Sequence, residues 1–236
     1  GPTKVPEPAL SPPQKFQLKE YLSAAARPVV LYGGSGWTAK AARQLETFAA
    51  ANDVPLVAAF RFHDICDNHH PCFVGEAGVG MLGYIKTLLR QADMIIALNI
   101  RFGEMTTDGY SLFDVPKMAA KLIHSHISDA ELGKIYIADL PLLAGPNAMA
   151  EALVDIKLDL DSKRQNWCTA AKAAYDANFD VATQPGSVNM GTVLAHLREV
   201  LPDNAIVTNG AGNFAIWPGK FIRYGKKTLS PSTRRY

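Results

Sequence analysis

The stretch Pro28-Val-Val-Leu-Tyr32-Gly-Gly-Ser-Gly36 decides the fold class that the sequence predicts. Its first five residues are apolar, which is typical of a strand buried on both faces, as in a parallel sheet. Glycines follow at once, and the run from Ala39 to Ala51 has the composition of a helix. A strand, a glycine turn and a helix in succession form the first half of a βαβ unit.

This alternation repeats along the chain. The segment from Arg61 to Gly75 is expected to be a long polar loop. Strands alternating with helices favour an α/β fold with a doubly wound parallel sheet and helices on both faces. The remaining predicted elements are strands at 54–59, 93–98, 120–124 and within 136–143, helices at 14–26, 79–91 and 149–158, and a helical turn at 129–132.

The composition changes near residue 161. A lone helix–strand unit cannot cover both faces of a sheet, so we expect the last segment to be an incomplete second domain. Its apolar residues after Gly210 are expected to be mobile or paired with another copy of the chain. The predicted organisation is a Pro-rich linker at 1–13, a central α/β domain at 14–160, a helix (163–179) and linker within 161–187, and the start of a second domain at 188–236, with a helix at 189–200 and a strand at 205–207.

Composition and charge narrow the function classes. The chain has 236 residues, of which 48% are hydrophobic and 19% charged, as in ordinary globular proteins. A formal net charge of +2 gives no strong field for nucleic acid or anionic lipid, and no apolar run approaches the roughly 20 residues of a membrane span. We therefore expect neither partner. The three cysteines form no regular framework, which favours a reducing, cytoplasmic location.

The glycine turn is the first candidate binding site. Gly33, Gly34, Ser35 and Gly36 lie where a strand meets a helix, so backbone N–H groups and the helix dipole can face a phosphate. A second cluster, Gly75 to Gly80, precedes another helix. The spacing is not that of the dinucleotide fingerprint, and no acidic residue ends the second strand. Two interpretations stay open: a bound nucleotide, or plain turns without a ligand.

The His- and Cys-containing loop at 63–72 offers the common ligand types for zinc. Paired Cys-x-x-Cys motifs are absent, so a histidine-rich surface loop is favoured. We expect His124 and His126 on opposite faces of their strand, and therefore not as a pair. No Ser-His-Asp order or His-Glu-x-x-His motif is present, so the sequence indicates no self-contained active site.

Several short segments are specific in combination. They are 28–36, Asp67-Asn68-x-His70-Pro71-x-x-x-Gly75, Ala92-Asp93, Arg101-Phe102-Gly103-Glu104, Ile123-His124 and Glu131-Leu132-Gly133-Lys134. Together they resemble the central domain of thiamine-diphosphate-dependent enzymes of the acetolactate synthase-like family. The run 201–208 is similar to the start of that family's C-terminal domain. The resemblance covers roughly residues 14 to 225.

This resemblance implies an enzyme of three domains that acts on a 2-oxo acid as a lyase or transferase. Thiamine diphosphate and Mg²⁺ would be held at a Gly-Asp-Gly motif ending in Asn, and an N-terminal domain would supply a catalytic glutamate. Neither this motif nor an N-terminal domain occurs in these 236 residues. We therefore expect a catalytically incomplete piece without catalytic or metal-binding residues, whose partners are the missing N- and C-terminal domains in a homo-oligomer.

The resemblance also implies where cofactors would lie. Gly33, Gly34, Arg101 and Phe102 would line a nucleotide cleft, and Gly212 and Asn213 match a segment beside the cofactor diphosphate. The flavin-binding pattern of the family is not kept at 103–104 or at His126 and Ser128. We therefore expect no FAD, and weak adenine-nucleotide binding or none. The alternative is a free-standing nucleotide-binding or scaffold domain without catalysis. An NAD-dependent deacetylase would need a Cys-x-x-Cys zinc pair, which is absent.

Overall fold

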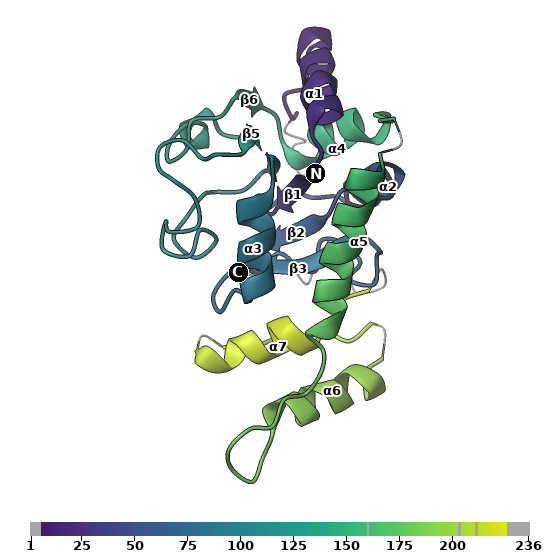
Figure 1. Ribbon diagram of the computed structural model, residues 1–236, viewed down its shortest axis with the longest axis vertical. Helices are drawn as coiled ribbons and strands as arrows, with labels where there is room; N and C mark the ends of the chain where they lie inside the picture. The colour runs from purple at the N-terminus through teal and green to yellow at the C-terminus, as the bar shows by residue number, and fades with distance from the viewer. Residues whose placement is uncertain (1–5, 160, 203, 211, 226–236) are drawn as a thin grey trace, which may run out of the picture.

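The computed structural model describes residues 6–159, 161–202, 204–210 and 212–225 (Figure 1). Its centre is a six-stranded sheet in which all the neighbouring strands are parallel, in the order β3-β2-β1-β4-β5-β6. The direction of winding reverses between β1 and β4, which makes the doubly wound α/β fold predicted from the sequence. The strands are β1 (Pro28–Tyr32), β2 (Leu56–Ala59), β3 (Phe73–Ala77), β4 (Met94–Leu98), β5 (Lys121–His126) and β6 (Leu140–Leu143).

Helices flank this sheet. The first five are α1 (Pro12–Ala24), α2 (Ala39–Asn52), α3 (Gly83–Gln91), α4 (Pro146–Val154) and α5 (Ser162–Ala177). Helix α2 packs against α4, while α3 and α5 pack against each other and against β3 (Figure 1). Because the sheet is covered by helices, every residue of β1, β2 and β4 is buried. The core between the layers includes Tyr32, Leu45 and Phe48, none of which has exposed surface.

Two elements differ from the prediction in an informative way. Strand β3 begins inside the segment that we expected to be a polar loop. Gly75, at a φ of +117°, and Glu76 interrupt its apolar pattern, and β3 lies at an edge of the sheet. Helix α4 begins at Pro146, before the predicted start, because proline is well suited to the first helical position.

The chain after the sheet folds into a small second layer. It contains α6 (Met190–Val200), η2 (Asn213–Ala215) and α7 (Ile216–Phe221), below the sheet in Figure 1. The predicted strand at 205–207 is wrong: these residues form a loop. A strand needs a neighbour to bond with, whereas Val207 packs into an apolar cluster.

The expectation for the residues after Gly210 is also corrected. Phe221 and Ile222 are only 1% and 7% exposed and pack with Leu194. The backbone of Tyr224 exchanges hydrogen bonds with Asn68, at 2.8 and 2.9 Å, which ties this segment to the sheet domain. Phe221 and Ile222 therefore have partners within the chain, whereas Phe214 and Ile216 stay 52% and 42% exposed. Residues 226–236 of the predicted second domain lie outside the described residues.

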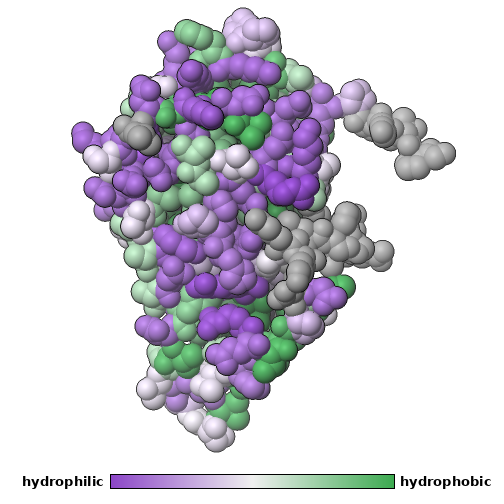
Figure 2. All heavy atoms as spheres, turned by 90° about the vertical axis from the view of Figure 1, so that its right-hand side faces the viewer, coloured by the Kyte–Doolittle hydropathy of each residue, from purple (hydrophilic) through white to green (hydrophobic). Residues whose placement is uncertain are grey.

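Helix α6 keeps an exposed apolar stripe. Val193, Leu197 and Val200 recur at helical spacing and are 40%, 36% and 57% exposed. Figure 2 shows several green patches in this lower part of the molecule. Within the described ranges, no helix is both long enough and apolar enough to cross a membrane.

Candidate functional site

The glycine turn after β1 is tightly enclosed by its neighbours. A Cβ on Gly33 would lie 2.9 Å from the Ala59 Cβ and 3.1 Å from the Ile100 Cγ2. Gly34 has a φ of +69°, and a Cβ there would lie 2.1 Å from the carbonyl oxygen of Asn99. Close packing at the ends of β2 and β4 therefore requires both glycines, with or without a ligand.

Side chains of the same molecule hold this turn. Trp37 Nε1 donates to the Gly33 carbonyl at 2.7 Å, and Asn99 Nδ2 donates to the Ser35 carbonyl at 2.8 Å. Asn147 Nδ2 donates to the carbonyl of Gly36 at 2.9 Å. Ser35 and Gly36 remain exposed, so they are the accessible part of the predicted phosphate turn.

The helix starts next to the turn already have partners. The backbone N–H of Thr38 donates to Asn147 Oδ1 at 3.0 Å, and the Thr38 hydroxyl accepts from the N–H of Ala41 at 3.1 Å. At the start of α4, the Glu7 carboxylate accepts from the N–H groups of Asn147 and Ala148, both at 3.1 Å. The chain's own groups thus occupy donors that a phosphate would use.

Arg101 and Phe102 lie beyond β4 but in different surroundings. The Arg101 side chain is 76% exposed, and its Nε is 3.6 Å from a carboxylate oxygen of Glu131. Phe102 is buried and makes edge-to-face contacts, with ring centroids 5.0 Å from both His124 and Tyr136. Arg101 is therefore accessible to an anion, whereas Phe102 belongs to an aromatic cluster of the core.

The expectation that His124 and His126 point to opposite faces is wrong. Residues two apart on a strand share a face, and the two ring centroids are 6.4 Å apart. Burial lowers the pKa of His124 to about 4. The hydrogen bond between its Nε2 and the carbonyl of Ile100, at 3.1 Å, raises the pKa but does not offset burial. Burial also lowers the pKa of His126. Both imidazoles are therefore neutral at pH 7.

Polar atoms without partners gather near the carboxyl ends of the central strands. Among the described buried side chains, Asn99 Oδ1, His124 Nδ1 and Ser125 Oγ have no hydrogen-bond partner. Asn99 also holds the glycine turn. Its unpartnered oxygen is the observation at these strand ends that favours a polar ligand.

A second cluster of polar groups lies at the β3 edge. His63 Nδ1 is 3.3 Å from one oxygen of Glu76, whose other oxygen accepts from the N–H of Arg61 at 2.6 Å. Burial opposes a charge on His63, but the Glu76 carboxylate outweighs it and raises the pKa of His63. The ring of Tyr224 covers His63, at 4.7 Å between centroids. This edge therefore combines a half-buried ion pair with the docked C-terminal segment.

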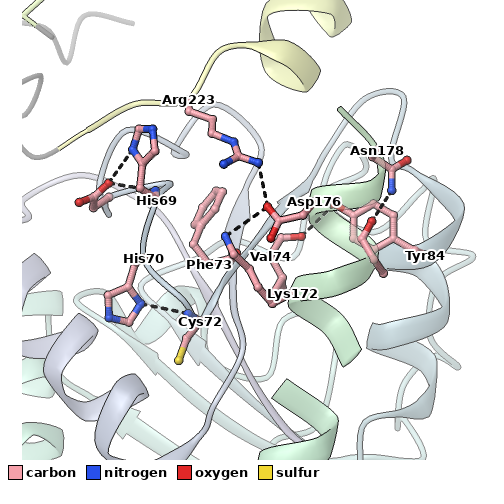
Figure 3. Close-up of polar contacts among 12 residues, drawn as sticks. His69, His70, Cys72, Phe73, Val74, Tyr84, Lys172, Asp176, Asn178 and Arg223 are labelled. Atoms are coloured by element: carbon pink, nitrogen blue, oxygen red, sulfur yellow. Dashed lines mark hydrogen bonds and ion pairs between the residues drawn. The ribbon is translucent and has the colours of Figure 1, made fainter. Parts of the chain in front are cut away.

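Helix α5 extends the same cluster (Figure 3). Lys172 Nζ donates to the carbonyl of Phe73 at 3.4 Å and is 3.6 Å from Asp176, which also pairs with Arg223 at 2.8 Å. Cys72 lies next to these residues, and its N–H donates to His70 Nδ1 at 3.2 Å. In the part of the chain that the structure describes, no three His, Cys, Asp or Glu side chains form a group able to hold a metal ion.

Gly212 and Asn213 are placed with this second region and not with the glycine turn. Both are exposed at η2, and α7 follows directly. Ile216 of α7 lies against Gly80, where an added Cβ would be 2.9 Å from its Cγ2. The structure thus gathers Gly33 to Gly36 with Asn99 and Asn147, and separates them from η2.

Comparison with known proteins places this fold. The family model described as "Thiamine pyrophosphate enzyme, central domain" matches residues 17–153, which span the sheet and α2 to α4. The chain belongs to this family.

Its relatives include acetolactate synthases. The acetolactate synthase of Mycobacterium avium is 28% identical over 224 residues, covering 91% of this chain and 35% of that protein. The large subunit of acetolactate synthase isozyme 2 of Escherichia coli K12 is 24% identical over 209 residues, covering 88% of this chain and 37% of the relative. The chain therefore spans about a third of the length of these relatives.

The sequence did not indicate the residues that organise either region. Asn99 and Asn147 hold the turn, and Glu76 pairs with His63, yet each comes from a distant part of the chain. One usable signal was the position of Asn99 directly after a buried strand next to β1. Contacts across crossovers depend on strand order, which the local pattern does not contain.

Proposed function

We propose that this chain is the central, non-catalytic part of a thiamine-diphosphate- and Mg²⁺-dependent 2-oxo acid lyase or transferase of the acetolactate synthase kind. The observation that carries the proposal is the family match over 17–153 on a complete six-stranded sheet. The names of the relatives support the reaction class. The cofactor supplies the carbanion chemistry in such enzymes, and the protein supplies binding and orientation.

The described residues do not fit thiamine diphosphate with Mg²⁺. Mg²⁺ takes oxygen ligands in octahedral geometry, and the described ranges contain no group of three candidate ligand side chains. Of the positions that match a diphosphate-binding segment, Gly212 and Asn213 lie exposed on η2, apart from the glycine turn. We therefore assign no catalytic step to these residues and propose that the chain is catalytically incomplete by itself.

The role that we propose for the sheet domain is to space and orient catalytic domains. The exposed stripe of Val193, Leu197 and Val200 on α6 supports contact with a further domain or another copy of the chain, because such a stripe is normally covered. We propose the N- and C-terminal domains of the parent enzyme as partners, in a homo-oligomer. Three free, buried cysteines support a cytoplasmic location.

The second proposal concerns a nucleotide. The crowded turn and the Glu7 carboxylate at the start of α4 favour weak adenine-nucleotide binding or none, and no FAD. The free oxygen of Asn99 and the exposed Arg101 are the features that support a free-standing nucleotide-binding domain as the alternative function. Calorimetric titration decides between them: tight FAD binding would refute the first reading, and ADP binding that is unchanged in Arg101→Ala would refute a phosphate contact.

An activity assay tests the main proposal. The purified chain is incubated with pyruvate, thiamine diphosphate and Mg²⁺, with a full-length acetolactate synthase as the positive control. We expect no product above the protein-free background. Turnover that disappears when thiamine diphosphate is omitted would contradict the proposed incompleteness.

A further inference from the structure

Two of the three cysteines meet at the β3 edge. Cys72 directly precedes β3 and Cys168 lies on α5, and they are 3% and 5% exposed. The side chains of Cys168 and Cys72 interact with each other in the buried contact between α5 and the start of β3. Cys66, which is 1% exposed, lies elsewhere, beside Tyr32.

The packing of α5 on β3 brings Cys168 close to Cys72. Cys168, Lys172 and Tyr175 share one face of α5, because they are four and three residues apart. The Tyr175 ring meets the Phe73 ring edge to face, with 5.4 Å between centroids. Lys172 donates a hydrogen bond to the carbonyl of Phe73, and both residues are labelled in Figure 3. Phe73 follows Cys72 directly, so Cys168, one turn before Lys172, is brought against the neighbouring thiol.

The two sulfurs have unequal acidity. The interaction with Cys168 holds the pKa of Cys72 below its usual range; burial opposes this effect, and His70 adds to it. The same contact, together with burial, raises the pKa of Cys168. Burial raises the pKa of Cys66. Cys72 is therefore the more acidic thiol of the pair, and Cys168 is its neighbour.

We propose that Cys72 and Cys168 form a redox site at which a hydroperoxide oxidises the two thiols reversibly to a disulfide that fastens α5 to the start of β3. This inference is independent of the proposed function. Such a pair stays reduced in a reducing compartment and is oxidised transiently.

The chemistry balances in two steps. The Cys72 thiolate attacks one peroxide oxygen: an S–O bond forms, the O–O bond breaks, and the departing alkoxide or hydroxide takes a proton. The Cys168 sulfur then attacks the resulting sulfenic acid: the S–S bond forms, the S–O bond breaks, and water leaves with the thiol proton. The two thiols lose two electrons to the peroxide, which becomes an alcohol, or water, plus a further water. A small dithiol reverses the reaction by exchange.

The disulfide would fix α5 to the sheet domain, next to the small C-terminal layer of α6, η2 and α7. Helix α5 leads from the sheet to α6, and the bond would close a long loop between residues 72 and 168. Because a cross-link restricts the unfolded chain, we expect the Tm of the oxidised protein to rise by about 5–15 °C.

Peptide mapping of the full chain tests the proposal. The purified protein is treated with limiting hydrogen peroxide, free thiols are blocked with N-ethylmaleimide, and the unreduced digest is analysed by mass spectrometry. We expect a peptide cross-linked through Cys72 and Cys168, lost after dithiothreitol. The free thiol of Cys72 should disappear roughly 10-fold or more faster than that of Cys66.

Matched variants sharpen this result. Cys66→Ala should form the cross-link as the parent chain does, whereas Cys168→Ala should accumulate a sulfenic acid on Cys72 that dimedone traps. Three results would overturn the proposal. They are oxidation of Cys66 before Cys72, oxidation of Cys72 without a cross-link in the unsubstituted chain, and a bound metal that shields both thiols. The parent-chain map decides the matter even where a variant fails to fold.

Discussion

The turn at residues 33–36 and the edge of the sheet at β3 use their polar groups in opposite ways. At the turn, glycines are packed against the ends of neighbouring strands, and Asn99, Asn147 and Glu7 fill the hydrogen-bonding sites. At the β3 edge, polar and reactive groups converge from α5, the segment after α7 and the loop before β3.

The turn therefore reflects the packing of the fold, whereas the β3 edge reflects the particular side chains of this protein. A strand–glycine–helix turn is part of how a doubly wound sheet packs, and it needs no ligand to explain it. The more unusual side-chain environments occur where β3 meets α5 and the segment after α7. We expect substitutions in the two regions to differ in their effects on stability and on its pH dependence.

The largest effect is expected at the turn. Gly34→Ala places a Cβ into the Asn99 carbonyl at a positive φ, so the free energy of unfolding should fall by about 3–5 kcal/mol. Gly36→Ala is the matched control: its φ is +91°, but only Pro146 lies near, at 3.9 Å, so a loss of about 1 kcal/mol is expected. Urea denaturation measures both, and equal losses would refute the crowding account.

The next effect tests the C-terminal layer. Phe221→Ala removes a side chain that is 1% exposed, and the opening free energy of residues 213–225 should fall by about 3 kcal/mol. Amide hydrogen exchange should show this loss while β1 and β4 stay protected. Phe214→Ala, at a side chain 52% exposed, should leave exchange unchanged. Loss of protection throughout the sheet would mean that the two layers unfold together.

The buried His124 of β5 should make the free energy of unfolding depend on pH. Its folded pKa of about 4 lies below the usual 6.5, so the unfolded chain binds more protons between these values. Stability is therefore full above pH 6.5 and falls by about 2 kcal/mol between pH 6.5 and 5. His124→Phe should remove this part of the acid loss, whereas His196→Gln, on the exposed side of α6, should keep it. Identical pH profiles for all three proteins would count against a buried neutral imidazole.

His63 should show the opposite sign at the β3 edge, with a smaller effect. Its folded pKa is raised by Glu76, so the stabilisation is complete below the unfolded pKa of about 6.5 and is lost as the pH rises through the folded pKa. His63→Gln should cost about 1 kcal/mol at pH 5.5 and less at pH 8. Urea denaturation at the two pH values measures this difference, and a cost that grows with pH would contradict the ion pair.

The sequence predicted well what local pattern determines. The run Pro28–Tyr32 is a strand with the predicted bounds. Helix α2 begins at the predicted residue and ends at Asn52, directly after the predicted end. Both were predictable because uninterrupted apolar runs and helical composition are local signals. Strand β3 was missed because Gly75 and Glu76 lie in it. The strand expected at 205–207 is a loop, since extended structure depends on a partner strand that composition does not specify.

The candidate sites were harder to predict. The family resemblance was confirmed, yet nothing in the sequence around Gly34 indicated that Asn99 would fill the space beside it. Cys72 and Cys168 are far apart in sequence and meet only because α5 returns to the β3 edge. Pairs of this kind follow from topology, and the local pattern does not contain them.

We propose that this stretch carries the sheet domain of a thiamine-diphosphate-dependent enzyme without its cofactor site. Calorimetric titration of the purified chain with thiamine diphosphate in the presence of Mg²⁺ tests it most directly, because binding is measured without requiring catalysis. The account predicts no saturable heat up to millimolar cofactor, with or without Mg²⁺. Saturable binding that requires Mg²⁺ would contradict it.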